Sequence, residues 1–160
     1  MPIHPITRDD LPRVLAVLHA AFASVTEKFN ITRENCPMHT AYMPLEKLQR
    51  HWDSGFHMFG YYVDDDIVGY VSLEDKGGGA FELHNLAVLP EYRHCGYGSE
   101  LVRFCMDQAR DLNGTKLFLG FIDENELLKA WYIRNGFTYA GTEKFEHLPF
   151  TAGYMEWEVR

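Results

Sequence analysis

The sequence is poor in cysteine, in basic residues and in long apolar runs. Its three cysteines, Cys36, Cys95 and Cys105, are odd in number and lack Cys-x-x-Cys spacing, which argues against a disulfide framework and a cysteine-based zinc site. The histidines show no metal-ligand spacing, so no metal site is expected. No run approaches the roughly 20 apolar residues that span a bilayer, and the N-terminal residues lack the pattern of a signal peptide. We therefore expect a cytoplasmic protein that does not contact membranes.

The charge balance is acidic, with 15 Lys and Arg against 23 Asp and Glu and a formal net charge of −8. Nucleic-acid binding draws on clustered basic side chains, so no nucleic-acid partner is expected. The same charge would attract cationic molecules such as amines through electrostatic steering. Hydrophobic residues make up 46% of the 160 positions, which is enough for a sizeable core, and we expect a single domain over residues 1–160.

Hydrophobic periodicity along the chain predicts strands and helices in alternation. Strands are expected at residues 3–6, 56–63, 67–74, 80–89, 116–122, 137–146 and 154–159, and helices at residues 9–23, 44–52, 125–134 and after the glycines at 96 and 98. Residues 24–43 are predicted to form a long loop or an irregular helix, and Asp64 to Asp66 a hairpin turn rather than a metal ligand set. Strand–helix–strand crossovers require a parallel pair, whereas hairpins are antiparallel. The predicted fold is therefore α/β, with a mixed central sheet, mostly antiparallel with one central parallel step, flanked by about four helices.

One stretch points to a ligand. Residues 93–98, with the letters RHCGYG, lie between a strand-like run and an amphipathic helix. A glycine turn at a helix N-terminus offers unpaired backbone N–H groups and the positive end of the helix dipole, which together can cradle phosphate oxygens. A plain strand-to-helix connection with two convenient glycines is the alternative, because short glycine patterns recur by chance. A dinucleotide-binding fold is not expected, since Leu101 stands where its third glycine would be.

Two motifs resemble those of the GNAT superfamily of acyl-CoA-dependent N-acyltransferases. The run of residues 86–98 resembles that family's strand followed by Arg/Gln-x-x-Gly-x-Gly/Ala. Asn125, Tyr132, Gly136 and Phe137 match its Asn-x6-Tyr-x3-Gly-Phe pattern. Each motif alone is short, but both occur in the family's order, and the predicted order of strands and helices fits as well.

The resemblance implies acetyl-CoA as the co-substrate, bound along this strand and turn. Its pyrophosphate is expected on the backbone amides of the turn, which belong to His94, Cys95, Gly96, Tyr97, Gly98 and Ser99. Arg93 is expected to brace the turn or approach a phosphate, and Asn125 to contribute to the cofactor site. The pantetheine arm would pair with the backbone of the strand, and an oxyanion donor is expected among the amides of Leu86, Ala87 and Val88.

Acyl transfer to an amine needs a base for the amine and an acid for the leaving thiolate. By the resemblance, Tyr132 takes the position of the general acid, and a phenol with a pKa of about 10 can donate to a thiolate of similar basicity; a core tyrosine is the alternative. Glu82 and His84 are the candidate bases, and strand alternation puts them on one face with Leu86 and Val88. Glu82, acting through water, is favoured because it matches the base of histone-acetyltransferase members, and His84 is the alternative.

The resemblance predicts an enzyme that moves an acetyl group directly from acetyl-CoA to a primary amine of a small molecule. No covalent enzyme intermediate is expected, because Cys95 has no visible base partner. In this family the region after the first helix shapes the acceptor pocket, and here it offers Phe22, Phe29, His39 and Tyr42. A non-catalytic acyl-CoA sensor and an acetyltransferase for protein N-termini or lysines are the alternatives. The identity of the acceptor and the formation of a homodimer stay open.

Overall fold

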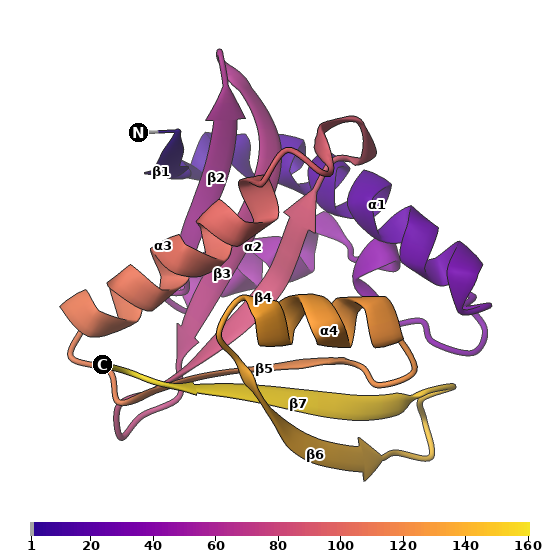
Figure 1. Cartoon of the computed structure of the whole chain (residues 1–160). Helices are drawn as coiled ribbons and strands as arrows, with labels where there is room; N and C mark the ends of the chain where they lie inside the picture. Colours follow the sequence, from indigo (N-terminus) through magenta and orange to yellow (C-terminus); the bar gives the residue numbers. More distant parts are fainter. Residues whose placement is uncertain (1) are drawn as a thin grey trace.

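The strands and helices follow the order that the sequence predicts, and all strands join one seven-stranded sheet (Figure 1). The structure is a computed structural model that describes residues 2–160. The strands are β1 (Ile3–Pro5), β2 (His57–Val63), β3 (Asp66–Asp75), β4 (Ala80–Val88), β5 (Lys116–Ile122), β6 (Thr138–Lys144) and β7 (Thr151–Glu158). The α-helices are α1 (Leu11–Lys28), α2 (Leu45–Asp53), α3 (Tyr97–Asp111) and α4 (Glu126–Arg134). Short 3-10 helices are η1 (Arg8–Asp10), η2 (Thr40–Tyr42) and η3 (Pro90–Tyr92).

The sheet has the strand order β1-β2-β3-β4-β5-β7-β6. Its neighbouring strands are antiparallel except β4 and β5. These two are parallel because the chain between them crosses over through α3. The predicted mixed sheet with one parallel step and four flanking helices is confirmed.

Helices cover both faces of the sheet. α1 and α2 pack on one face, where Leu11, Val14 and Leu18 of α1 are at most 1% exposed. α3 and α4 lie on the opposite face (Figure 1), where Leu101 and Val102 of α3 are fully buried. Apolar side chains three or four residues apart form these buried stripes, so the periodicity that predicts each helix also sets the face that it buries.

β4 and β5 are paired only where they begin, with Ala80 to Glu82 opposite Lys116 to Phe118. Beyond Glu82 the two strands diverge, and Figure 1 shows β5 turning away from β4 to lie along β7. The edge of β4 over residues 83–88 that faces β5 therefore has no partner strand within residues 2–160. Unpaired backbone N–H and C=O groups on a strand edge are available to a ligand that can pair with them.

A β-bulge interrupts β4 at Asn85. This residue has a φ of 56°, in the left-handed region, where asparagine is more readily accommodated than most residues. The register with β3 shifts at this point, from Ser72 opposite His84 to Tyr70 opposite Ala87. Three steps along β4 thus match two steps along β3, which turns the side chains after the bulge to the other face.

The bulge overturns the predicted faces of β4. Uninterrupted alternation would put Glu82, His84, Leu86 and Val88 on one face, and this prediction is wrong. Glu82 and His84 lie on the α1 and α2 face together with Ala87, whereas Leu86 and Val88 pack into the core beneath α3. The cause is the extra residue, because side chains alternate strictly only where the ladder is regular.

α1 extends beyond its predicted end and continues to Lys28. Ser24 and Thr26 fit in its last turns because their hydroxyls donate to the carbonyl oxygens of Ala21 and Ala23, at 3.2 and 2.8 Å. The predicted long loop is therefore shorter and covers residues 29–44, with η2 inside it.

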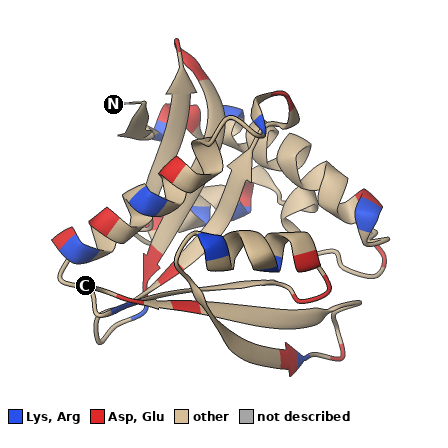
Figure 2. Ribbon diagram, in the orientation of Figure 1, with Lys and Arg blue, Asp and Glu red and all other residues tan. Residues whose placement is uncertain are grey.

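Charged residues lie at turns and along exposed helix faces. Asp64 has a φ of 55° in the turn between β2 and β3, so the predicted hairpin turn is confirmed. Acidic and basic residues alternate along α3 in Figure 2, and in that view Lys and Arg do not gather over one element.

Within residues 2–160, no helix combines the length and apolar character needed to cross a membrane.

Candidate active site

The glycine turn before α3 presents a row of free backbone N–H groups. Gly96 is the N-cap residue of α3, and its carbonyl accepts from the Glu100 N–H at 3.1 Å. The N–H groups of residues 94–99 donate to no acceptor within residues 2–160. His94 and Gly96 have φ values of 63° and 84°, and left-handed residues in such a turn direct successive N–H groups toward one concave side. These donors, at the positive end of α3, are suited to bind an anion.

Side chains on α1 and β2 hold the turn in place. The Arg93 guanidinium donates to the Ala21 carbonyl at 2.7 Å and to Ser24 Oγ at 3.1 Å. The Tyr97 ring stacks on that of Tyr61, with ring centroids 4.2 Å apart. Of the two predicted roles of Arg93, the structure thus supports bracing the turn, because two of its nitrogens are engaged within the protein.

α4 connects the glycine turn to Tyr132. A Cβ at Gly98 would lie 3.1 Å from Cζ2 of Trp131, so glycine lets the first turn of α3 approach α4 closely. The Trp131 ring in turn lies edge-on to the Tyr132 ring, with centroids 5.1 Å apart. Tyr132 is 6% exposed and is also flanked by Phe121 and Phe137. The predicted acid is therefore a core residue next to the predicted phosphate turn.

The Tyr132 hydroxyl is free to donate a hydrogen bond. Within residues 2–160, the fully enclosed side-chain polar atoms without a partner are His51 Nδ1 and Tyr70 Oη. The Tyr132 hydroxyl has no partner either and is not one of these two, so it reaches accessible space. Burial, with a smaller contribution from Cys105, raises the pKa of Tyr132, which keeps the phenol protonated at neutral pH. The accessible and unpaired hydroxyl suits a general acid, whereas the raised pKa makes the phenol a weaker acid than an exposed tyrosine.

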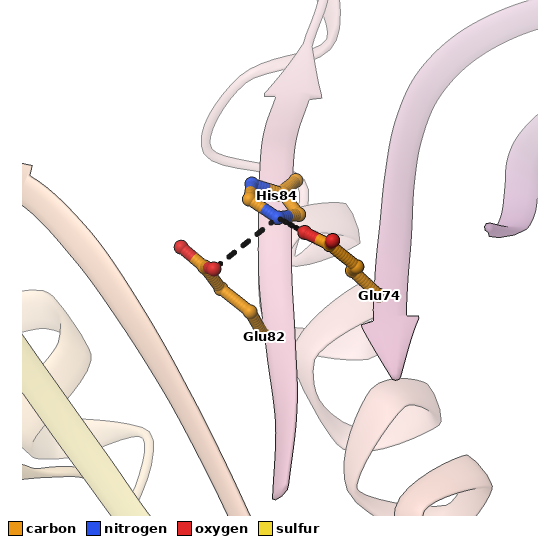
Figure 3. Close-up of side chains that lie close together, drawn as sticks. All are labelled: Glu74, Glu82 and His84. Atoms are coloured by element: carbon orange, nitrogen blue, oxygen red, sulfur yellow. Dashed lines mark hydrogen bonds and ion pairs between the residues drawn. The ribbon is translucent and has the colours of Figure 1, made fainter. Parts of the chain in front are cut away.

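Two neighbouring strands bring a histidine and two carboxylates together (Figure 3). Glu82 and His84 lie on β4, and Glu74 lies opposite Glu82 on β3. His84 Nε2 is 2.8 Å from Glu74 Oε1 and 3.5 Å from Glu82 Oε1. Lys76 Nζ is 3.5 Å from Glu74 Oε2 and 3.9 Å from Glu82 Oε1. The ligand atoms of Glu74, Glu82 and His84 lie within 4.8 Å of one another, close enough to share a metal ion. The expectation that the protein has no metal site came from histidine and cysteine spacing along the chain, and it stays a prediction.

Glu74 is a candidate that the sequence motifs did not reveal. The register of β3 and β4 is symmetric about Gly78, so counting equal steps outward from this three-glycine turn would have placed Glu74 opposite Glu82. Although burial raises it, the hydrogen bond from His84 and the charge of Lys76 hold the pKa of the Glu74 carboxyl below its ordinary value. The carboxylate is therefore ionised at neutral pH.

Three of the residues predicted to shape the acceptor pocket gather beside the bulge of β4. The His39 ring lies edge-on to the rings of Phe22 and Tyr42, with centroid distances of 5.9 and 6.2 Å. The neighbouring Thr40 hydroxyl donates to Oδ1 of Asn85 at 3.0 Å. The structure thus ties the segment between α1 and α2 to the same strand that bears Glu82 and His84.

A small apolar cluster joins this segment to the other end of the sheet. It connects residues after α1 with the end of β5 and the connection between β6 and β7. Its members are Val25, Phe29, Ile31, Cys36, Tyr42, Ile122, Leu148 and Phe150. Phe29, the fourth residue predicted for the acceptor pocket, belongs to this cluster and not to the aromatic group around His39.

Comparison with known families identifies the family of the chain. A family model described as the acetyltransferase (GNAT) family matches residues 22–137, which include the glycine turn and Tyr132. The chain belongs to the GNAT acetyltransferase family. It is 23% identical over 141 residues to an uncharacterized N-acetyltransferase in the pepI 3' region of Lactobacillus delbrueckii subsp. lactis, and the match covers 83% of this chain and 82% of that protein.

Solved GNAT structures share the fold over nearly the whole chain. The ribosomal-protein-S18-alanine N-acetyltransferase from Escherichia coli superposes with a TM-score of 0.78 at 17% identity, covering 98% of this chain and 92% of that one. The PaiA N-acetyltransferase from Thermoplasma acidophilum, solved in complex with coenzyme A, gives a TM-score of 0.74 at 18% identity, with 98% and 97% covered. With the family match, the protein is an acyltransferase enzyme.

The residues of this GNAT chain fit coenzyme A. The free N–H groups of residues 94–99 suit phosphate oxygens, and the unpaired edge of β4 suits the amide groups of an extended arm. Oδ1 of Asn125 accepts from the Leu128 N–H at 3.2 Å and caps α4, and the contribution of Asn125 to the cofactor site stays a prediction. The exposed Cys95 thiol donates to the Arg93 carbonyl at 3.6 Å.

Substitution of Gly96 provides a direct test of the phosphate turn. Gly96→Ala should weaken acetyl-CoA binding about tenfold, because a side chain at φ 84° strains the turn by roughly 1–2 kcal/mol and displaces its N–H groups. Gly55→Ala is a matched control, since Gly55 has a φ of 83° and, like Gly96, has no atom within 4 Å of an added Cβ. Titration calorimetry should show weaker binding in the first variant alone; equal binding by both would contradict the assignment.

Proposed function

We propose that this enzyme transfers the acetyl group of acetyl-CoA to a primary amine of a small molecule, directly and without a covalent enzyme intermediate. The observation that supports this most is the gathering of three features on β4 and the turn after it, namely the free N–H groups of residues 94–99, the unpaired edge of β4 and the Glu82–His84 pair. The available hydroxyl of Tyr132 is supplied by α4, which packs against this turn through Trp131 and Gly98. Cys95, the exposed cysteine in the turn, has no carboxylate or imidazole partner within residues 2–160, which speaks against a thiol nucleophile.

Each residue has a role in this reaction. When bound, acetyl-CoA would supply the acetyl group as a thioester. The N–H groups of residues 94–99 would hold its phosphates, and an N–H of β4 over residues 86–88 would stabilise negative charge on the carbonyl oxygen. Glu82 or His84 would accept the proton of the amine, and Tyr132 would give its proton to the departing sulfur.

Charge supports an amine as the acceptor. The net charge of −8 attracts protonated amines toward the protein. The carboxylates of Glu74 and Glu82 lie on the sheet face next to the predicted acceptor segment, and Lys76 Nζ already lies within 4 Å of both. These two carboxylates would attract a cationic group toward the candidate bases, as they attract Lys76.

The apolar cluster that contains Phe29 favours a small acceptor over a protein. The Escherichia coli neighbour acts, by its name, on an alanine of a ribosomal protein, so the fold by itself is compatible with either class. A peptide needs an open groove, whereas here the segment after α1 packs on the connection between β6 and β7 through Ile31, Leu148 and Phe150. Such packing leaves less room for an extended chain and supports the small-molecule assignment.

A turnover assay with an amine panel tests the proposal. The purified enzyme would be incubated with acetyl-CoA and, separately, with polyamines, amino acids, aminoglycosides and peptides with free N-termini, and both free thiol and acetylated product would be measured. We expect thiol release that depends on at least one small amine. Acetyl-CoA binding without turnover would indicate a sensor instead, and acetylation of peptides alone would indicate a protein acetyltransferase.

A further inference from the structure

The ring of His84 is held in a fixed plane. Phe56 stacks on it, with ring centroids 5.6 Å apart and planes inclined by 16°. On its other side Phe56 stacks on His51 of α2, at 4.4 Å and 10°. Phe56 is thus held between the two histidines and covers one face of the His84 ring. This contact and the short distance from Nε2 to Glu74 together limit how the His84 ring can tilt.

One nitrogen of this ring is committed to a carboxylate. Nε2 lies 2.8 Å from Glu74 Oε1 (Figure 3), and an ionised carboxylate only accepts hydrogen bonds. Nε2 therefore bears the hydrogen and donates it to Glu74. In the neutral ring the lone pair then resides on Nδ1.

Nδ1 of His84 is available to a substrate. It has no hydrogen-bond partner within residues 2–160, and it is not among the fully enclosed unpartnered atoms, so it reaches accessible space. Glu82 has one oxygen near cations, since its Oε1 lies 3.5 Å from His84 Nε2 and 3.9 Å from Lys76 Nζ. Of the two candidate bases, His84 is the one whose orientation is set by a short contact to a carboxylate and by an aromatic stack, which leave Nδ1 unoccupied.

We propose that Glu74 is a positioning residue that holds His84 in the tautomer and orientation in which Nδ1 takes the proton of the acceptor amine. This inference rests on the proposed function. The proton passes from the ammonium group to Nδ1, which leaves a neutral amine with a free lone pair and an imidazolium with an N–H on each nitrogen. The positive charge of the imidazolium faces the Glu74 carboxylate, which stabilises it. The proton later leaves from Nδ1 to solvent.

Four charged or titratable groups face His84 from the elements around it. Glu74 on β3 and Glu82 on β4 favour the imidazolium, whereas Lys76, after β3, disfavours it. His51 of α2 lies beyond Phe56 and adds a like charge only when protonated. The Glu74 carboxylate is the nearest of the four, so removing its charge should change the protonation of His84 most.

Glu74→Gln separates charge from hydrogen bonding, because the amide oxygen can still accept from Nε2. In the enzyme without substrate, the midpoint of the His84 ring signal in an NMR pH titration should fall by about 1 pH unit. In turnover, kcat should drop about tenfold, and the KM for acetyl-CoA should not change. The acid limb of the pH profile of kcat/KM should move to lower pH by about 1 pH unit, as the NMR midpoint does. Glu156→Gln is the control, since it neutralises a carboxylate on β7 that pairs with Lys116 and not with His84.

Each outcome decides the matter. An unmoved NMR midpoint in Glu74→Gln would overturn the assignment of Glu74, whether or not turnover is found. A moved midpoint with an unmoved acid limb would show that His84 is not the proton acceptor, as would loss of turnover in Glu82→Gln with full turnover in Glu74→Gln. Absence of turnover in the unaltered enzyme would instead contradict the proposed function, so the two failures are distinguishable.

Discussion

Tyr132→Phe should lower kcat about 100-fold and leave the affinity for acetyl-CoA unchanged. The variant removes only the hydroxyl, and general acids contribute roughly 100-fold to 10,000-fold to rate. That hydroxyl has no partner within residues 2–160, so its loss leaves no unpaired group, and the ring still packs on Trp131 and Phe137. Thiol release measures kcat, and calorimetry measures binding.

Tyr62→Phe is the matched control for this experiment. It also removes one phenol oxygen, which here donates to Asp10 Oδ2 at 3.4 Å on the far side of the sheet. We expect full turnover from this variant. If Tyr132→Phe also retained full turnover, Tyr132 would be a core tyrosine and the thiolate would take its proton from another source.

Acid should destabilise the protein through His51, by about 2 kcal/mol between pH 7 and pH 5. Burial, followed by the charges of Lys47 and His84, lowers the pKa of His51 to about 4, against about 6.5 in the unfolded chain. Its Nδ1 is enclosed and has no partner, so a proton there would have no acceptor. Between these two values the unfolded state binds the proton and the folded state does not, and the free energy of unfolding therefore falls as the pH falls.

Urea unfolding at pH 7 and pH 5 measures this effect, with His51→Phe as the reference. Phenylalanine does not titrate and keeps an aromatic ring against Phe56, so the variant should lose about 2 kcal/mol less than the unaltered protein over the same interval. Carboxylates contribute equally to both proteins and cancel in the comparison. Equal losses would mean that His51 is protonated in the folded state at pH 5.

Local patterns account for the geometry of the glycine turn and for the position of Tyr132. The glycine turn depends on residues within a few positions of one another, since Gly96 supplies a left-handed N-cap and Gly98 a close approach to α4. The position of Tyr132 on the buried face of α4 follows from helical spacing. These features could be predicted because short-range backbone preferences and periodicity are written in consecutive residues.

Other parts of the site depend on pairing between distant segments. Side-chain alternation along β4 is a local rule, and it failed at Asn85 because the bulge arises from the register with β3. The contact of Glu74 with His84 follows from that same register, since the two residues are ten positions apart on different strands. The open edge of β4 exists because β5 diverges from it after Phe118 while staying paired with β7 along its whole length.

The sequence by itself determined the order of elements, the glycine turn at a helix N-terminus and the family, because these reside in motifs of neighbouring residues. Only the tertiary structure decided which side chains share a face and which backbone groups are left unpaired, because both depend on strand register and on where paired strands part. The geometry of the turn around Gly96 was therefore predictable. The contact between Glu74 and His84, which depends on strand register, was not.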